Sequence, residues 1–383
     1  MKYDSNITKQ MNSDIMGVIF LFLKFYDKHT FKRMSRRNNK NKITICETCQ
    51  IDDANTSILM NYPHIISINI SNNKYVTNLN HMSDLKKLSI YNDSFGDEEI
   101  KNFTNLEELD ISNNMNITSL NHMTKLKRLT NVHNTKITDD GLKNLTNLTY
   151  LNISGNKTLK YINQMTELVE LHIDCTNIQN DGIYNLTNVK ILDISCNFNI
   201  KNLNHMLQLE VLIDEFIFGD LKHVPSIDDG IQKLNLKELY IDNNHGITKI
   251  GHMTNLKILH ISDKCKVDNE ELNKLTELEE LVMYMNEKIT DINCLKKLRK
   301  LYIKNCALTD EGISELTELD ILSINDKTHI KSLKNLKKIG HLDCPKDMLP
   351  EDFGIECKID KIKNLFFIPG RRKHVQQLSL LHN

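Results

Sequence analysis

The chain has 383 residues, of which 49 are lysine or arginine and 50 are aspartate or glutamate. Because the net charge is close to zero, the composition gives no general attraction to nucleic acid or to a membrane, and we expect neither as a partner. The nine cysteines are scattered and odd in number, which indicates reduced thiols in a cytoplasmic protein rather than a disulfide framework.

The first apolar stretch, IMGVIFLFL, runs from Ile15 to Leu23. It is too short to span a bilayer. A secretory signal remains an alternative for this stretch. However, Lys2 and Lys9 ahead of it are offset by Asp4 and Asp14, and no small-residue cleavage site follows.

The segment from residue 12 to 40 also predicts two short helices. Ser13 or Asp14 can cap the first helix, and Asp27 can cap the second. The apolar residues of the first helix form a continuous face: Ile15, Ile19, Phe22 and Leu23. Two such helices expose more apolar surface than they can bury against each other, which indicates that they dock on another surface.

This segment resembles the F-box. The acidic-Ile-Leu part of that family's pattern is matched by Asp14, Ile15 and Met16, its Ile-Phe…Leu part by Ile19, Phe20 and Leu23, and its end by Asp27 and Ser35-Arg36-Arg37. The sequence departs from the pattern at Met11-Asn12, where the family has Leu-Pro, and it lacks the tryptophan after the arginine pair. The resemblance implies that Ile15, Ile19, Phe20 and Leu23 bind a Skp-type adaptor.

Cys46 and Cys49 form a C-x-x-C pair. No second pair follows at zinc-finger spacing, and no βαβ pattern of the thioredoxin kind surrounds it. We therefore assign the pair to a first, degenerate repeat that begins near Ile43, and we expect no metal site there.

A template L-x-x-L-x-I-x-x-N recurs from about Ile43 to Cys344, mostly at intervals of 20 to 22 residues. The middle of each copy, such as LEELDIS at Leu106–Ser112, alternates apolar and polar residues, which predicts a short strand with one buried face. The asparagine after each strand is expected to bond unpaired backbone groups of the turn, as at Asn114 and Asn156.

The template resembles the leucine-rich repeat family. This resemblance implies an α/β solenoid with a curved parallel sheet on its concave side and short helices or 3₁₀ turns on its convex side. The domain boundaries that we predict are an F-box-like helical segment at 1–42, the solenoid at 43–344, and a C-terminal cap and tail at 345–383.

Short and long copies alternate, so the structural unit is a pair of repeats of about 41 to 43 residues. Short copies resemble internalin repeats and have apolar residues at every third position, which suits an extended or 3₁₀-like return. Long copies resemble the repeats of F-box leucine-rich proteins and carry helix-start signals. These signals are ITDDGL at 137–142, IQNDGI at 178–183, SIDDGI at 226–231 and LTDEGI at 308–313.

The motif LNHM and its variants return in every second copy and place histidines at His81, His122, His205 and His252. Two strand spacings, roughly 10 Å, separate successive histidines. A zinc ion holds its ligands at about 2 Å, so these histidines cannot share one. We interpret the motif as a structural part of the repeat and expect no metal.

One interval in the array is lengthened to 27 residues. It follows Asp214, which stands where the template has Ile, and it contains Glu215 to Ile227. An insertion in a solenoid forms a loop on one face, so the segment is either part of a binding face or a neutral insertion.

The sequence contains no G-x-S-x-G, no P-loop and no H-E-x-x-H motif. We therefore expect a non-enzymatic protein without a cofactor. An F-box directly before leucine-rich repeats is typical of substrate receptors of cullin-RING ubiquitin ligases, and the Asn/Ile/Lys-rich repeats resemble those of giant-virus proteins. Two alternatives remain: a free-standing binding scaffold, and helices that only cap the first repeat.

The partner is expected on the concave face of the later repeats of a monomer. There the outward strand positions change from mostly polar to apolar and aromatic at Val211, Ile213, Tyr240, Ile258, Val282, Tyr284 and Tyr302. Glu215, Glu238, Asp242 and Glu280 surround them, which predicts a partner with apolar and basic residues. The alternative is that such residues only favour strands.

Overall fold

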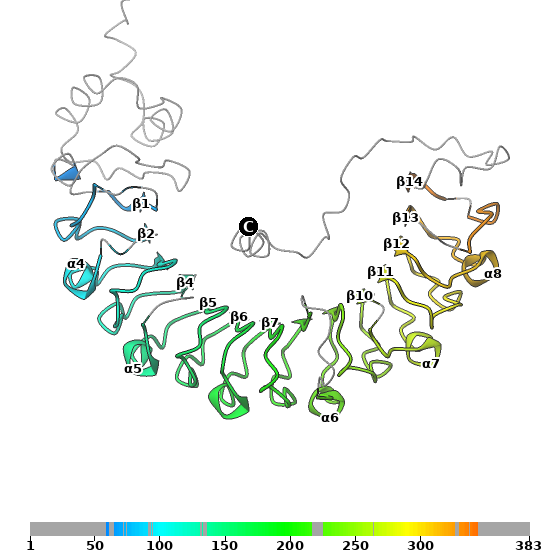
Figure 1. The fold of residues 1–383 in the computed structure, drawn as a ribbon, viewed down its shortest axis with the longest axis horizontal. Helices are drawn as coiled ribbons and strands as arrows, with labels where there is room; N and C mark the ends of the chain where they lie inside the picture. Colours follow the sequence, from blue (N-terminus) through cyan, green and yellow to red (C-terminus); the bar gives the residue numbers. More distant parts are fainter. Residues whose placement is uncertain are drawn as a thin grey trace, which may run out of the picture. The chain divides into compact units, whose positions relative to one another are not determined.

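The computed structural model describes residues 59–343, with gaps at 61–64, 72, 74, 91–92, 94, 131, 133–135, 217–224, 263, 326–328 and 337. It contains two compact units, Met1–Leu236 and Lys237–Asn383. The described part of each unit is built from one repeating element, a short strand followed by a return segment (Figure 1). The fold is thus the predicted parallel-sheet solenoid with short helices.

In the first unit, successive copies of the template form a parallel ladder. Its strands are β1 (Ser67–Asn69), β2 (Lys87–Ser89), β3 (Glu108–Asp110), β4 (Arg128–Thr130), β5 (Tyr150–Asn152), β6 (Glu170–His172), β7 (Ile191–Asp193) and β8 (Val211–Ile213). Each strand pairs with the next in the same register, so that equivalent residues of the repeats lie side by side.

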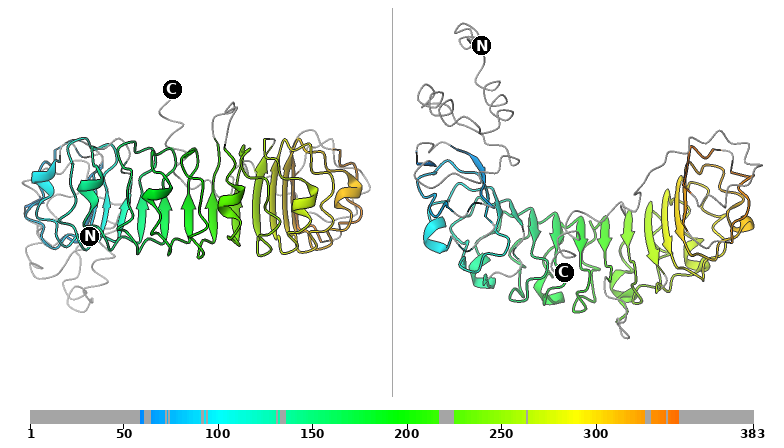
Figure 2. Two further views of the ribbon diagram at one scale, coloured as in Figure 1. Left: turned by 90° about the horizontal axis from the view of Figure 1, so that it is seen from below. Right: turned by 45° about the horizontal axis from the view of Figure 1, so that its top comes forward.

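In the second unit, the ladder consists of β9 (Glu238–Tyr240), β10 (Ile258–Ser262), β11 (Glu280–Tyr284), β12 (Lys300–Lys304), β13 (Ile321–Asn325) and β14 (His341–Asp343). Its pairs are also parallel. Figure 2 shows the strand arrows of each unit pointing the same way. Four of these strands are five residues long. In them the strand continues past the isoleucine or methionine that stands two positions after the central leucine.

Short helices lie in the return segments, on the side of each unit opposite the strands (Figure 1). They are α4 (Asp97–Ile100), α5 (Asp139–Leu142), the 3₁₀ helix η2 (Asn180–Gly182) and α6 (Asp228–Ile231) in the first unit, and α7 (Asn269–Leu272) and α8 (Asp310–Ile313) in the second. The predicted starts of α5, α6 and α8 are confirmed, and the looser signal gives η2. The sequence analysis missed α4 and α7.

The core of each unit is a stack of the inward template residues. The central leucines of four successive strands, Leu88, Leu109, Leu129 and Leu151, pair in register and are at most 2% exposed. Burying one such side chain contributes about 1.5–3 kcal/mol. A single copy has only one buried row, so it gains this energy only by stacking on its neighbours.

The asparagine after each strand fixes the turn. Asn114 is fully buried, and its side-chain oxygen accepts from the backbone N–H groups of Asn116 (2.9 Å) and Ile117 (2.8 Å). Its amide donates back to the carbonyl of Phe95 in the preceding copy (2.9 Å). The predicted role of this asparagine is confirmed, because it satisfies backbone groups that the strand ladder leaves unpaired.

The asparagine of LNHM bonds forward to the next copy. The Asn121 amide donates to the carbonyl of Asp140 in α5 (2.6 Å), and its oxygen accepts from the N–H of Asn144 (3.0 Å). Asn204 and Asn293 make the same two bonds to the helices that follow them. Each short copy thereby holds the helix of the long copy that follows it in the sequence.

The histidine of the motif bonds in the opposite direction. Nε2 of His122 donates to the carbonyl of Ile100 (2.9 Å), and Nε2 of His205 donates to that of Ile183 (3.1 Å). Both carbonyls belong to the long copy before the motif. Both histidines thus have a structural role, since each satisfies a carbonyl at the end of a preceding helix.

Helix glycines allow neighbouring copies to approach. The Gly141 carbonyl accepts from the N–H of Leu120 (2.8 Å), and a Cβ atom on Gly141 would lie 2.3 Å from the Thr118 carbonyl oxygen. Gly312 is in the same position, with 2.0 Å to the Thr290 oxygen. The glycine of the D-D/E-G motif is therefore required by close packing of backbone on backbone.

Candidate functional site

The outward side chains of the strands form a surface in each unit, here called the strand face. Alternate strand residues point away from the core, so a column of equivalent outward residues crosses the ladder. In the first unit the central column runs through Asn152, His172 and Asp193. In the second it runs through Tyr240, His260, Val282 and Tyr302.

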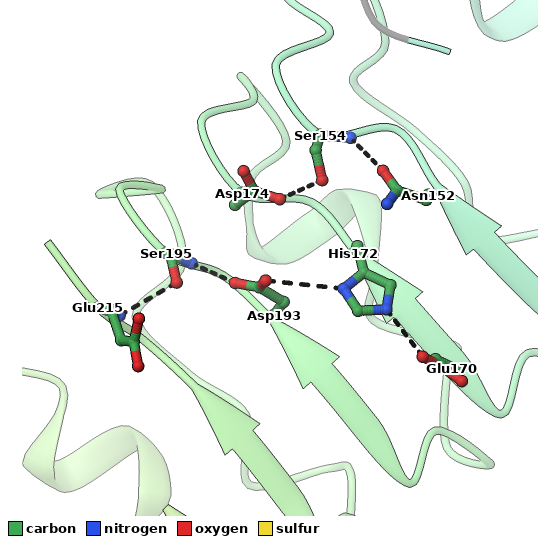
Figure 3. A network of polar contacts seen from close by, with 8 residues as sticks. All are labelled: Asn152, Ser154, Glu170, His172, Asp174, Asp193, Ser195 and Glu215. Atoms are coloured by element: carbon green, nitrogen blue, oxygen red, sulfur yellow. Dashed lines mark hydrogen bonds and ion pairs between the residues drawn. The ribbon is translucent and has the colours of Figure 1, made fainter. Parts of the chain in front are cut away.

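A polar network centred on His172 occupies the strand face of the first unit (Figure 3). Nε2 of His172 lies 2.9 Å from Glu170 Oε1, and Nδ1 lies 3.6 Å from Asp193 Oδ2. The His172 ring is also 5.6 Å, centroid to centroid, from the ring of Tyr150, and the Arg128 guanidinium covers that tyrosine. The His172 ring is buried, at 3% exposure, whereas Glu170 and Asp193 remain partly exposed.

Serine hydroxyls extend the network along the ends of the strands (Figure 3). The Ser154 hydroxyl hydrogen-bonds to Asp174, and the Ser195 hydroxyl accepts from the backbone N–H of Glu215 (3.1 Å). The Ser195 N–H donates to Asp193 (3.0 Å). The network therefore connects the turns of four successive copies.

Burial and charge set the protonation of this network. Burial opposes the charged form of His172, but its interactions with Asp193 and Glu170 outweigh that cost and raise its pKa to about 9. Burial, together with the charge of Asp193, raises the pKa of Asp174 to about 7. At neutral pH His172 is thus an imidazolium, and Asp174 is close to the midpoint of its titration.

The strand face of the second unit has an aromatic column. The ring of Tyr240 packs edge-on against that of His260, with centroids 4.5 Å apart, and the Tyr240 hydroxyl donates to Glu238 (2.8 Å). In the adjacent column, Lys300 donates to Glu280 (3.0 Å). The aromatic column is therefore bordered by a column that contains the carboxylates of Glu238 and Glu280.

His260 is fully buried within this column, and neither ring nitrogen has a hydrogen-bond partner. Burial lowers its pKa to about 3, so the ring is neutral at physiological pH. A buried imidazole without partners costs folding free energy, which indicates that its position is set by packing around it.

The structure places the predicted partner-binding residues on the outward positions of the strands. Val211 and Ile213 in the first unit and Ile258, Tyr284 and Tyr302 in the second are partly exposed. Two residues require a correction, because Tyr240 is 7% exposed and Val282 is fully buried. Val282 lies between His260 and Tyr302 in the register of its column. Binding of a partner by this set remains a prediction.

The predicted adaptor-binding residues Ile15, Ile19, Phe20 and Leu23 lie outside the described residues, as do the Cys46–Cys49 pair and most of the insertion. Asp214, at the start of the insertion, is buried. In the described part of the chain, no helix has the length and apolar character needed to cross a bilayer. The same residues contain no cluster of three or more metal-ligating side chains.

The sequence analysis found the outward strand positions of the earlier repeats to be mostly polar, but it missed His172. A signal was present, because the template places His172 and Asp193 at equivalent positions of adjacent copies. An ionisable pair at equivalent positions of neighbouring parallel strands lies within contact distance.

A family model described as "Leucine Rich repeat" matches residues 294–321. Among solved structures, an internalin of Listeria monocytogenes str. 4b F2365 is 24% identical, with a TM-score of 0.54, covering 70% of this chain and 82% of the internalin. A leucine-rich repeat protein of Leptospira interrogans is 19% identical, with a TM-score of 0.58, covering 86% and 98%. The fold is that of leucine-rich repeat proteins.

The structure of a receptor in complex with a bound partner is also similar. A plant peptide hormone receptor, RGFR1, in complex with RGF2 is 18% identical, with a TM-score of 0.51, covering 80% of this chain and 55% of the receptor. No curated protein sequence matches the chain. At these identities, the likeness establishes a shared leucine-rich repeat fold and leaves the bound partner open.

Proposed function

We propose that the protein is a binding scaffold whose strand face in the second unit takes up a protein partner. The observation that carries the proposal is the aromatic column, with the partly exposed Tyr302 in it and the partly exposed Tyr284 and Ile258 beside it. Tyrosine is a favoured anchor at protein interfaces, because it combines a large apolar area with a hydroxyl. The fold supports the proposal, since one similar structure is a receptor in complex with RGF2.

The charges around the column define the proposed partner. Glu238 on β9 and Glu280 on β11 lie in the column beside it, and Glu280 is already engaged by Lys300. A partner with apolar residues and a basic side chain would match this pattern, with the basic group reaching Glu238 or displacing Lys300.

The test compares two double variants of the full chain as bait in an extract of the source cells. Tyr284→Ala with Tyr302→Ala removes partly exposed rings and leaves the buried Tyr240–His260 packing intact. The matched control, Ser89→Ala with Asp110→Ala, changes outward strand residues of the first unit. Quantitative mass spectrometry should show at least a tenfold loss of specific partners with the tyrosine variant alone. Loss with the control alone would contradict the proposal.

The finer proposal is that residues 12–40 make the scaffold a substrate receptor of a cullin-RING ubiquitin ligase. Its support is the F-box-like pattern and its position directly before the repeats. The alternative is a free-standing scaffold without a ubiquitin role. In this proposal, Ile19→Asp abolishes co-purification with a Skp-type adaptor, because a charge would be buried in an apolar interface, whereas Lys9→Asp outside the pattern does not. Equal adaptor recovery with Ile19→Asp and the unchanged chain favours the alternative.

A further inference from the structure

Two cysteines of the first unit occupy equivalent positions of adjacent copies. Cys175 follows β6 and Cys196 follows β7, each three residues beyond the register pair His172 and Asp193. Both have left-handed backbones, with φ of 53° and 56°. The N–H of Cys175 donates to the carbonyl of Ser195 (2.8 Å), so the two turns are held side by side.

This placement satisfies the main requirement for a disulfide. Neighbouring parallel strands lie roughly 4.8 Å apart, and disulfides join Cα atoms separated by about 4.4–6.8 Å. The Ser195 carbonyl that accepts from the Cys175 N–H directly precedes Cys196, so the two side chains start from adjacent backbone segments. Both residues are partly exposed, so a small oxidant reaches them without unfolding of the repeat.

The other cysteines in the described residues are placed differently. The thiols of Cys265 and Cys306 are buried and donate to the backbone carbonyls of Ile241 (2.8 Å) and Met283 (3.3 Å). Cys294 contacts the side chain of Asn273 (2.9 Å). None of these three cysteines has another described cysteine at the equivalent position of an adjacent copy, which makes them internal controls for the pair.

We propose that Cys175 and Cys196 form a reversible disulfide that links two successive repeats of the strand face. With glutathione disulfide as oxidant, the thiolate of one cysteine attacks a glutathione sulfur and releases one glutathione thiolate. The thiolate of the second cysteine then attacks the protein sulfur of the mixed disulfide and releases the second glutathione thiolate. Two protein thiols are oxidised, one glutathione disulfide is reduced, and two protons pass to solvent.

The surroundings of the pair set the rate of this reaction. The Cys196 thiol and burial raise the pKa of Cys175, and the charge of Asp174 acts in the same direction. Because the thiolate is the attacking species, the link should form slowly at neutral pH and faster in alkaline solution. The pair is therefore a reduced dithiol under mild conditions and closes under sustained oxidation.

Closure would also change what Cys196 contacts. Its sulfur now lies 3.7 Å from the carbonyl oxygen of Glu215, at the start of the inserted segment. Ser195, next to Cys196, accepts from the N–H of the same residue. A disulfide to Cys175 removes the thiol proton from the first contact, so oxidation acts on the edge of the polar network.

The experiment treats the folded full chain with glutathione disulfide, blocks remaining thiols, digests it without reductant and maps linked peptides by mass spectrometry. We expect a Cys175–Cys196 link in most molecules, two mass units below the sum of the reduced peptides, that dithiothreitol reverses. Cys265→Ser should leave the link unchanged. The oxidised chain should unfold several degrees higher than the reduced chain, and this difference should vanish in Cys175→Ser and in Cys196→Ser.

Two results would overturn the proposal. The first is separate glutathione adducts on Cys175 and Cys196 that persist without conversion to an internal link, because then the sulfurs do not meet. The second is a link between either residue and Cys294 that forms at the same rate as the Cys175–Cys196 link, which would indicate reaction through unfolded chains. The rate of link formation is measured at pH 7 and at pH 9. A link that is slow only because little thiolate is present forms faster at pH 9, whereas a link that the geometry prevents does not.

Discussion

At the scale of single residues, the return segments depend on glycines that touch a neighbouring backbone. Gly141→Ala would place a Cβ atom 2.3 Å from the carbonyl oxygen of Thr118, which cannot move without breaking the contact between copies. We expect a loss of at least about 2 kcal/mol in the free energy of unfolding, measured by urea denaturation.

Gly96→Ala is the matched control for Gly141→Ala. Its added Cβ would lie 3.3 Å from a carboxylate oxygen of Glu99, a flexible side chain that can shift. Its cost should be at most a few tenths of a kcal/mol, as for a glycine at a helix N-cap. Similar losses at both positions would show that the backbone approach at Gly141 is less tight than described.

The two buried histidines of the strand faces should give opposite pH dependences. The folded pKa of His172, about 9, lies above its ordinary value of 6.5, so its stabilisation is complete below pH 6.5 and is lost as the pH rises through 9. The difference amounts to up to about 3 kcal/mol. His172→Gln should therefore flatten the stability curve between pH 6.5 and 9, as measured by chemical denaturation across this range.

His260 should act in the acid range. Its folded pKa, about 3, lies below its ordinary value of 6.5. Between these values the histidine is protonated in the unfolded chain but neutral in the folded chain. The free energy of unfolding therefore falls as the pH drops from 6.5 toward 3. His260→Phe removes this acid sensitivity and should raise stability at pH 5, because it replaces an unpartnered polar ring with an apolar one. Unchanged acid sensitivity in this variant would mean that the ring finds a partner in solution.

At the scale of elements, the bond from Asn121 to α5 is the main directional link between a short and a long copy. Asn121→Ala removes both bonds. The carbonyl of Asp140 and the N–H of Asn144 then lose their hydrogen bonds to this side chain. A loss of about 1–2 kcal/mol in unfolding free energy is expected. Thr124→Ala, an exposed change in the same turn, should be neutral, and equal effects of the two would remove the special role of the asparagine.

The regular elements could be predicted from the sequence because they depend on periodicity. The alternation in LEELDIS gave β3, and the Asp-Asp-Gly signal gave α5 and α6. The helices α4 and α7 were missed because glutamate stands in place of that glycine. There the carboxylates of Glu99 and Glu271 accept backbone N–H groups instead, from Gly96 and Gly251.

The candidate site could be predicted only in part. Register placed Tyr240, Val282 and Tyr302 in one column, since the side-chain period of a strand is two. Their exposure could not be predicted, because Val282 is fully buried and Tyr240 packs on His260. Those contacts depend on side-chain conformations rather than on the pattern of residue types.

At the scale of the molecule, each described strand contacts only its immediate neighbours within its unit, as expected of a solenoid. The energetic consequence is that stability is a sum over copies and the interfaces between them. A destabilised copy such as that of Gly141→Ala should therefore show faster amide hydrogen exchange in β4 and β5 than in β7 and β8 of the same unit. Uniform acceleration across the first unit would indicate a cooperative block instead.

The opposite directions of the asparagine and histidine bonds also determine how such a chain can grow or shrink by gene rearrangement. Removal of residues 124–165 joins Met123 to Thr166 and preserves the alternation of short and long copies. Each asparagine of the LNHM motif then still bonds to the helix of the copy that follows it. Removal of residues 124–145 is a smaller loss but brings two short copies together, and Asn121 then faces no helix. We expect the longer deletion to keep cooperative thermal unfolding by circular dichroism and the shorter one to lose it. The unit of insertion or deletion is therefore a pair of one short and one long copy. Related proteins with this array should differ in length by even numbers of copies.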